Sequence, residues 1–335
     1  MSLRLALAGL LGLTLALSGC AVGGQAGAQP DPLPANPLSG SSLWVDPEST
    51  AQRAADASRA SGDAAAADAL APITSQPVAT WLASQDDSPY AEAERVTTAA
   101  TAGSGLPVLV AYHRPGRDCG SYSAGGSADR GSYLAWVGAL AAGIGDRRAV
   151  VVLEPDAVAQ AVSGACGSAE QAAATLDMLS AAVDVLEKQP GVLVYIDAGH
   201  AGWVDDVDAV AVALRSSGVA RADGFSLNVA NFQTTADSVS YGERLSAALG
   251  QRQFVVDVSR NGRGAPAVRD GVDAWCNPAG AALGENPRLV AGPALAVAFL
   301  WIKEPGASDG DCRPGEPAAG VFWPEYARRL VAQRP

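Results

Sequence analysis

Histidine is scarce in this chain, and basic residues are outnumbered by acidic ones. The 335 residues include 2 His, and 23 Lys and Arg stand against 35 Asp and Glu, which gives a formal net charge of −12. A surface of that sign repels phosphate backbones and anionic lipids, so we exclude nucleic acid and anionic membrane surfaces as main partners. The chain also lacks CxxC spacing and a His cluster, so we expect no metal site and no cofactor.

The position of the last histidine excludes the serine hydrolases of the α/β-hydrolase class. Residues 306–310 read Gly-Ala-Ser-Asp-Gly, which matches the G-x-S-x-G turn of α/β hydrolases. That class needs a His downstream of the Ser, but the last His is His200. The pattern therefore does not indicate a serine hydrolase.

The N-terminus has the pattern of an export signal. Arg4 precedes an apolar run over residues 5–17, which is short for a membrane span. The run ends in Leu-Ser-Gly-Cys, which resembles the lipobox of bacterial lipoproteins. Residues 1–19 are therefore predicted to be a signal peptide and Cys20 to be lipidated, with ordinary cleavage slightly further on as the alternative.

Composition also separates a tether from a folded domain. Gly, Ala and Pro dominate residues 20–35, which predicts a flexible segment after the lipidated Cys. One folded domain is expected over residues 36–335. We expect the protein to be exported, and to lie on the outer face of the cell membrane as a lipoprotein or to be secreted, with the lipid anchor as its sole link to a membrane.

The cysteines beyond Cys20 are even in number. Cys119, Cys166, Cys276 and Cys312 allow three pairings. Sequential pairing is the simplest, since each bond would close a moderate loop and stabilise the fold by roughly 3 kcal/mol in an oxidising compartment.

The chain from residue 77 onward alternates short β-branched runs with longer Ala-rich stretches, as βα units do. Seven strands are predicted, over residues 78–83, 107–112, 149–154, 192–197, 224–229, 253–258 and 297–302. Helices are predicted between them, over residues 91–102, 132–143, 169–188, 206–216 and 235–249. We therefore expect an α/β fold, a distorted seven-stranded parallel β/α barrel similar to a TIM barrel.

Carboxylates collect at the predicted strand ends. Asp118, Glu154, Asp156, Asp197 and Asp309 all lie at or just past the end of a strand. A single Asp in such a place is usually a helix cap, but the C-terminal ends of barrel strands converge on one face, so the set predicts an active-site cleft there. Carboxylates without a metal suit acid and base catalysis on a glycosidic bond.

The tryptophans add to this interpretation. Trp81, Trp203 and Trp275 lie near strand ends or in loops, where an indole face can stack on a sugar ring. A single Trp more often belongs to the core, and Trp301, inside an apolar strand, is assigned there.

Several longer motifs occur in a fixed order. They are Arg-Asp-Cys-Gly at 117–120, Glu-Pro-Asp at 154–156, Tyr-Ile-Asp-Ala-Gly-His at 195–200, Val-Asp-Val-Ser-Arg-Asn-Gly at 256–262, Trp-Ile-Lys-Glu-Pro-Gly-Ala-Ser-Asp-Gly at 301–310 and Phe-Trp-Pro at 322–324. In these motifs and their order the chain from residue 36 on resembles glycoside hydrolase family 6, which contains inverting cellulases.

The resemblance implies four catalytic positions. Asp156 matches the general acid, and Asp118 matches the carboxylate that keeps the acid protonated and is linked to the attacking water. Asp309 matches the residue proposed as base, a role that is disputed in the family, where a water relay is the alternative. Asp197 matches a supporting carboxylate for electrostatics and substrate placement.

The resemblance also implies seven substrate-binding positions: Trp81, Tyr112, His200, Trp203, Asn231, Trp275 and Lys303. The tryptophans would stack on sugars in the glycone and aglycone subsites. The tyrosine would lie beneath the distorted sugar next to the cleaved bond, and the other three would bind hydroxyls.

The family's two disulfides correspond to the sequential pairing of the cysteines. The chain departs from the family at Ala307, where most members have Glu, and it has Glu304 three residues earlier. His113 and Arg114 occupy a stretch that is usually more neutral. These departures leave the substrate preference open.

The short stretch 309–323 predicts an open cleft. We therefore expect a monomeric endo-β-1,4-glucanase that acts on cellulose or cello-oligosaccharides with inversion, its carboxyls about 6.5 to 9.5 Å apart. One alternative is a catalytically weak, cell-surface glucan-binding lipoprotein. Another is a hydrolase of a different β-glucan.

Overall fold

The computed structural model describes residues 32–84, 87–266 and 274–335. The predicted signal peptide, Cys20 and the tether up to residue 31 lie outside the described residues. Leu33–Pro335 form one compact unit. In the described ranges, no helix is both long and apolar enough to cross a membrane.

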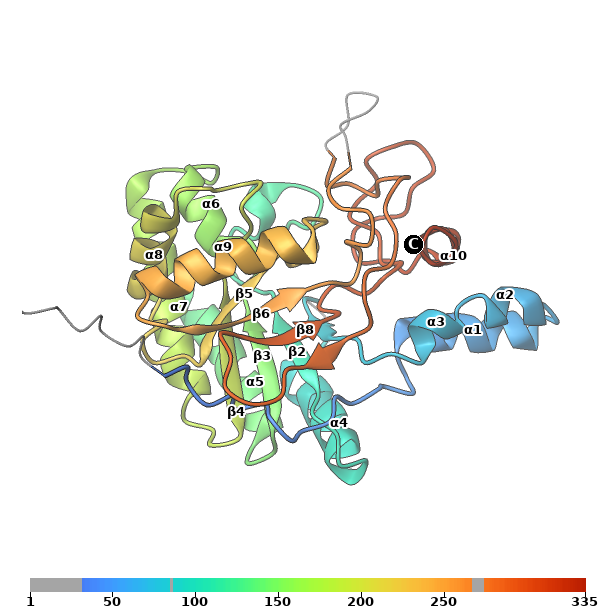
Figure 1. Cartoon of the computed structure of the whole chain (residues 1–335), viewed down its shortest axis with the longest axis horizontal. Coiled ribbons are helices and arrows are strands. Elements are labelled where there is room, and N and C mark those ends of the chain that lie inside the picture. Colours follow the sequence, from blue (N-terminus) through green and yellow to red (C-terminus); the bar gives the residue numbers. More distant parts are fainter. Residues whose placement is uncertain (1–31, 85–86, 267–273) are drawn as a thin grey trace, which may run out of the picture. The chain divides into compact units, whose positions relative to one another are not determined.

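One eight-stranded sheet forms the centre of the unit (Figure 1). The strands are β1 Thr80–Leu82, β2 Val108–Ala111, β3 Ala149–Leu153, β4 Val192–Asp197, β5 Gly224–Leu227, β6 Gln253–Asp257, β7 Arg288–Leu289 and β8 Ala296–Leu300. Their order is β1-β2-β3-β4-β5-β6-β8-β7, and every neighbouring pair is parallel except β7 with β8. The predicted parallel α/β architecture is confirmed.

The predicted seven-stranded closed barrel is wrong in two respects. The sheet has an eighth strand, β7, whose two residues are too few to form a recognisable apolar run. The sheet also curls without closing. β1 and the end of β8 meet at a single bridge between Val78 and Trp301, where the Ala79 N–H donates to the Trp301 carbonyl (2.9 Å). With three residues, β1 is too short to form a ladder on both edges, so the result is a half-barrel.

The strands carry apolar side chains on both faces of the sheet. In β2, Val108 and Val110 pack into a cluster inside the curl, whereas Leu109 and Ala111 pack outward against the helices. This alternation follows from the two-residue period of a strand. It continues past the strand end, so the next inward side chain lies on the floor of the cleft.

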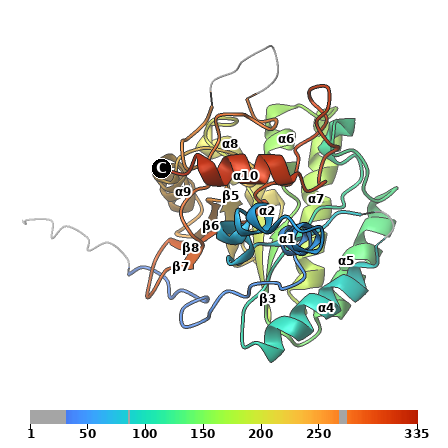
Figure 2. The ribbon, with the colours of Figure 1, turned by 90° about the vertical axis from the view of Figure 1, so that its right-hand side faces the viewer.

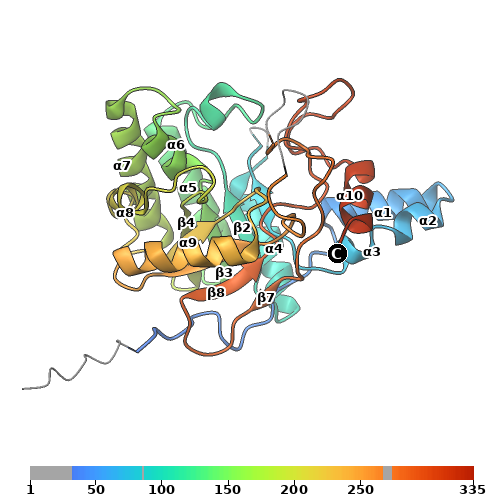
Figure 3. The same cartoon turned by 45° about the horizontal axis from the view of Figure 1, so that its top comes forward.

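The helices of the βα units are α4 Pro89–Ala102, α5 Arg130–Ile144, α6 Ala157–Ser163, α7 Ala169–Leu186, α8 Val207–Ser216 and α9 Thr235–Ala248. All but the short α6 correspond to predicted helices. Capping boxes start α5, at Asp129 and Ser132, and α7, at Ser168 and Gln171. Figures 1 and 3 show α7, α8 and α9 along the outer side of the sheet.

A second group of helices lies at the other side of the sheet. It comprises α1 Thr50–Ala60, α2 Ala64–Asp68, α3 Ala71–Thr74 and the C-terminal α10 Pro324–Ala332, which lie side by side in Figures 1 and 2. Glu304, in the loop after β8, accepts the N–H of Ala51 (3.1 Å) and the hydroxyl of Thr50. A carboxylate is favourable at a helix N-terminus, so this contact docks α1 onto the loop that carries Lys303.

Candidate active site

The last inward-facing residue of five consecutive strands is polar. These residues are Tyr112, Glu154, Asp197, Asn228 and Asp257, at or just beyond the ends of β2 to β6, and all are buried. Parallel strands end at the same edge of the sheet, so the five side chains form a polar ring at the floor of the cleft. Of this ring, the sequence predicted Tyr112 and Asp197 as binding and catalytic residues, and placed Glu154 among the carboxylates that gather at the strand ends.

Two carboxylates of the ring hold the loop that follows the neighbouring strand. Glu154 accepts the backbone N–H groups of His113 (2.8 Å) and Arg114 (3.2 Å). Asp197 accepts the backbone N–H of Asp156 (2.9 Å). These charge-assisted bonds fix where the loops begin.

Asp257 plays the same part on the other side of the ring. It accepts backbone N–H groups from Ala230, Ser259 and Lys303, each at 2.9 Å. The loops after β5, β6 and β8 are therefore joined at one buried carboxylate. The cleft is rigid because its loops share these acceptors.

Asp156 lies directly above the ring and keeps part of its surface open to the cleft. Burial raises the pKa of Asp156 to about 8, and the negative charges of Asp197 and Asp118 add to the rise, while Arg114 and Lys303 oppose it. The carboxyl is thus largely protonated at neutral pH. Its backbone is in the left-handed region, with φ 71°, at the N-cap of α6.

Asp118 lies in a one-turn helix, Asp118–Gly120, and its carboxylate accepts the N–H of Ser123 (2.8 Å). Asp118 and Cys119 have positive φ, 55° and 51°. Arg117 donates to the Tyr112 carbonyl (2.7 Å), and its guanidinium carbon lies 4.9 Å from the centroid of that tyrosine ring. The sequence analysis gave Arg117 no role.

Asp309 is held by two cations. Its carboxylate pairs with Arg260 (2.8 Å) and Lys303 (3.3 Å) and accepts the N–H of Asn277 (3.0 Å). Burial alone would raise the pKa of Asp309, but the charges of Arg260 and Lys303 outweigh it and keep the pKa below its ordinary value. Arg260 and Asn277 are site residues that the sequence analysis missed.

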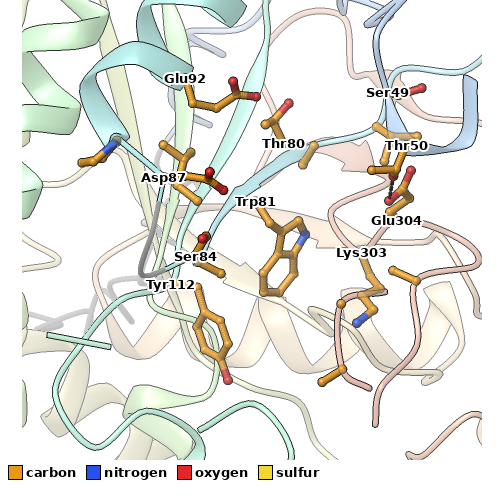
Figure 4. A pocket seen from close by; sticks show the side chains of 18 of the residues that line it. Ser49, Thr50, Thr80, Trp81, Ser84, Asp87, Glu92, Tyr112, Lys303 and Glu304 are labelled. Atoms are coloured by element: carbon orange, nitrogen blue, oxygen red, sulfur yellow. Dashed lines mark hydrogen bonds between the residues drawn. The ribbon is translucent and has the colours of Figure 1, made fainter. Parts of the chain in front are cut away.

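A cavity of about 840 Å³ opens beside Trp81, Tyr112 and Lys303 (Figure 4). Trp81 donates its indole N–H to the Ile302 carbonyl (2.7 Å), and its ring meets the Tyr112 ring edge-on, 5.4 Å between centroids. The Lys303 ammonium lies 5.7 Å from the Trp81 ring centroid. The structure thus brings these three predicted binding residues together.

The other predicted binding residues are not among those that line this cavity. Trp203 and Trp275 are each 37% exposed. His200 lies beside Trp203, 6.2 Å between ring centroids, and its buried Nδ1 has no hydrogen-bond partner among the residues described. Burial lowers the pKa of His200 to about 4, so the ring is neutral. Asn231 uses its amide oxygen locally, on the N–H of the next residue (3.1 Å).

The two disulfides are Cys119–Cys166 and Cys276–Cys312, so the sequential pairing is confirmed. Within the described ranges, Cys276, Cys312 and Glu316 are the one group with metal-compatible spacing. Both of its sulfurs are already bonded to each other, so this group is not a suitable metal site.

The fold and the site define a class: an α/β half-barrel with a cluster of buried and partly buried carboxylates at the strand C-terminal ends. The sequence matches the profile of Glycosyl hydrolases family 6 over residues 38–334. The chain belongs to that family, and the resemblance read from its motifs is confirmed.

Similar proteins carry endoglucanase names. The chain is 42% identical over 293 residues to Endoglucanase A of Cellulomonas fimi, covering 87% of this chain and 61% of that sequence. It is 38% identical over 296 residues to Endoglucanase 1 of Streptomyces halstedii, covering 86% and 88%. A solved structure of the endoglucanase Cel6 from Mycobacterium tuberculosis, in complex with methyl-cellobiosyl-4-deoxy-4-thio-β-D-cellobioside, has a TM-score of 0.81 and 42% identity, and covers 89% of this chain and 99% of that one.

Proposed function

We propose that this protein is an endo-β-1,4-glucanase that cleaves internal bonds with inversion. The observation that carries the proposal is the carboxyl of Asp156, whose pKa of about 8 keeps it protonated in an open cleft beside other carboxylates. Membership of family 6 and the endoglucanase names of similar proteins support it.

Asp156 acts as the general acid. It gives its proton to the glycosidic oxygen as the bond to the anomeric carbon breaks, so the leaving sugar departs as an alcohol. Asp197 holds the Asp156 backbone and, with Asp118, favours the protonated form. Asp156 therefore carries its proton before the substrate binds.

The attacking water is activated on the side of Asp118. Asp309, paired with Arg260 and Lys303, has a low affinity for protons and is a poor base. Asp118 is partly exposed and pairs with no cation in the described structure. In this proposal Asp118 accepts the proton of the attacking water through a water relay. Asp309 positions Lys303.

Substrate binding follows from the aromatic and polar groups of the cleft. Trp81, Trp203 and Trp275 stack on sugar rings, and Tyr112 supports the sugar at the cleaved bond. His200, Asn231 and Lys303 bind glucan hydroxyls, with the Lys303 ammonium as a donor. The ligand is neutral β-1,4-glucan.

The same proposal covers the location of the protein. Two disulfides fit an oxidising compartment. We assign residues 1–19 to an export signal, Cys20 to lipidation, residues 20–35 to a tether and residues 36–335 to a monomeric catalytic domain.

The decisive experiment follows the viscosity of hydroxyethylcellulose and the release of reducing ends together. Endo cleavage lowers the viscosity well before many ends appear. NMR of the first product formed distinguishes inversion, which gives the α-anomer, from retention. Bound glucan without new ends would overturn the proposal in favour of a binding protein, and faster cleavage of a mixed-linkage glucan would change the substrate.

A further inference from the structure

The cavity beside Trp81 extends beyond the side chains that face the catalytic carboxylates. Its lining includes the whole of β1 and the starts of α1 and α4. Trp81 belongs to the cluster inside the curled sheet, whereas Thr80, on the opposite face of β1, lies with the helix starts. In Figure 4, Tyr112 and Lys303 lie below Trp81, and Thr80, Glu92 and Ser49 lie above it.

The cavity can reach both faces of β1 because the barrel is open. β1 has a full ladder with β2 and a single bridge to the β8 side, at Val78. The cavity therefore passes around the free edge of β1 and has an inner half, at Trp81, and an outer half, at Thr80. A volume of about 840 Å³ is near the upper end of ordinary ligand pockets and holds more than one sugar ring.

The outer half has fixed polar walls. At the start of α4, Glu92 pairs with Arg95 (2.7 Å), which also pairs with Asp46 (3.0 Å). At the start of α1, the hydroxyl of Thr50 is held by Glu304. These interactions hold the hydrogen-bonding groups in place before any ligand binds, which lowers the entropic cost of recognition.

The charge of the outer half indicates a neutral ligand. Its lining contains five carboxylates, Asp46, Glu48, Asp87, Glu92 and Glu304, against the guanidinium groups of Arg53 and Arg95. An anionic polymer is repelled by that balance. A polyhydroxylated chain can donate to the carboxylates and accept from the cations.

We propose that the outer half is an additional glycone subsite, which binds the sugar next beyond Trp81 in a β-1,4-glucan chain. This rests on the proposed function, in which Tyr112 supports the sugar on the glycone side of the cleaved bond. A chain that runs from Tyr112 past Trp81 enters the outer half next. The subsite favours substrates that extend at least three sugars toward the non-reducing end of the cleaved bond.

The test compares the full chain with a pair of leucine variants. Ala91 is exposed on the first turn of α4 and lines the outer half, whereas Ala99 is exposed on the same helix and does not line it. Ala91→Leu adds bulk that neither stacks on nor hydrogen-bonds to a sugar, and Ala99→Leu is its matched control. Thr80→Val removes a hydroxyl without changing side-chain volume, so it tests the subsite if Ala91→Leu does not fold.

The readout is the product pattern from cellohexaose labelled at its reducing end. We expect the wild type to release unlabelled cellotriose, and Ala91→Leu to lower the ratio of cellotriose to cellobiose about tenfold, the scale of one lost pocket contact. Thr80→Val lowers it by about threefold, and Ala99→Leu leaves it unchanged. A ratio equal in Ala91→Leu and Ala99→Leu, or wild type that releases only cellobiose, overturns the subsite.

A binding experiment separates this result from failure of the proposed function. Calorimetry measures the affinity for cellohexaose and cellotetraose without any turnover. We expect tighter binding of the longer chain, and a loss of that advantage in Ala91→Leu. A protein that hydrolyses nothing overturns the proposed function, and the subsite then stands or falls on the affinity difference alone.

Discussion

Asp156 unites an unfavourable backbone conformation with an unfavourable charge environment. Its φ of 71° is uncommon for a residue with a side chain, and its carboxyl lies where burial and two neighbouring carboxylates resist ionisation. The raised pKa is what acid catalysis near neutral pH requires.

The first prediction concerns the proton on Asp156. Catalysis requires the protonated form, so turnover falls as pH rises through about 8, the pKa of this carboxyl. Asp156→Asn lowers kcat by at least about 10²-fold on unactivated glucan and leaves glucan affinity within about threefold. Initial rates and calorimetry check this, with Asp184→Asn, at an exposed ion pair, as control. Equal losses of affinity and turnover would contradict the role given to Asp156.

A second prediction concerns the buried pair of Arg260 and Asp309. Arg260→Met leaves Asp309 buried with Lys303 as its remaining cation, so we expect a loss of about 3 to 5 kcal/mol in the free energy of unfolding. Arg221→Met, at the exposed pair with Asp184, costs at most about 1 kcal/mol. Urea unfolding measures both variants. Similar midpoints for the two would mean that the buried pair does not stabilise the fold.

At the scale of elements, sequence pattern predicted the strands and helices of the βα repeat. It missed short elements and also two helices outside the repeat, α1 with 11 residues and α10 with 9. The seven apolar runs are strands because each fills a layer on both faces of the sheet. β7, with two residues, and α2 and α3, with five and four, are stable only in their tertiary context and carry too little pattern to be recognised. The closure of the barrel depends on how far β1 pairs, which no local pattern encodes.

The candidate site was likewise predicted only in part from the sequence. The motifs predicted Asp118, Asp156 and Asp309, and the structure places them at one edge of the sheet. Asp257 was missed as a site residue although a local signal exists, since it continues the inward-facing register of its strand. Glu154 was predicted only as one of the carboxylates at the strand ends. The pairing of Arg260 with Asp309 spans 49 residues, so sequence spacing alone could not show it.

A third prediction concerns the docking of α1. Glu304 joins the start of this helix to the loop of Lys303, so Glu304→Ala removes a partly buried acceptor for two donors. We expect a loss of about 1 to 3 kcal/mol in unfolding free energy and faster hydrogen exchange in α1. Glu325→Ala, at a surface pair within α10, is the control. Unchanged exchange in α1 would show that other contacts hold it.

For the whole molecule, the carboxyls at the cleft floor make stability depend on pH. Burial raises the pKa of Glu154 to about 7, of Asp156 to about 8 and of Asp197 to about 6. In the unfolded chain these pKa values are about 4. Between about pH 4 and the raised pKa values, the folded state therefore binds more protons than the unfolded chain does. Its stability decreases as pH rises through that range.

The fourth prediction follows from this balance. The free energy of unfolding falls between about pH 5.5 and about pH 8.5, by an amount on the order of 6 kcal/mol. Asp156→Asn removes one of the three carboxyls, so its stability declines less over the same range. Urea titrations at both pH values measure the slopes. A wild type that is more stable at the higher pH would contradict the prediction.

The left-handed backbone at Asp118 and Asp156 affects any search for variants with a higher melting temperature. Glycine adopts that conformation without steric cost, and at Asp156 it would also remove a carboxyl that resists burial. Selection on melting temperature alone would thus drift toward glycine at the centre of the chemistry. The same few residues affect both the melting temperature and the turnover, so a screen for stable variants of this protein has to measure both.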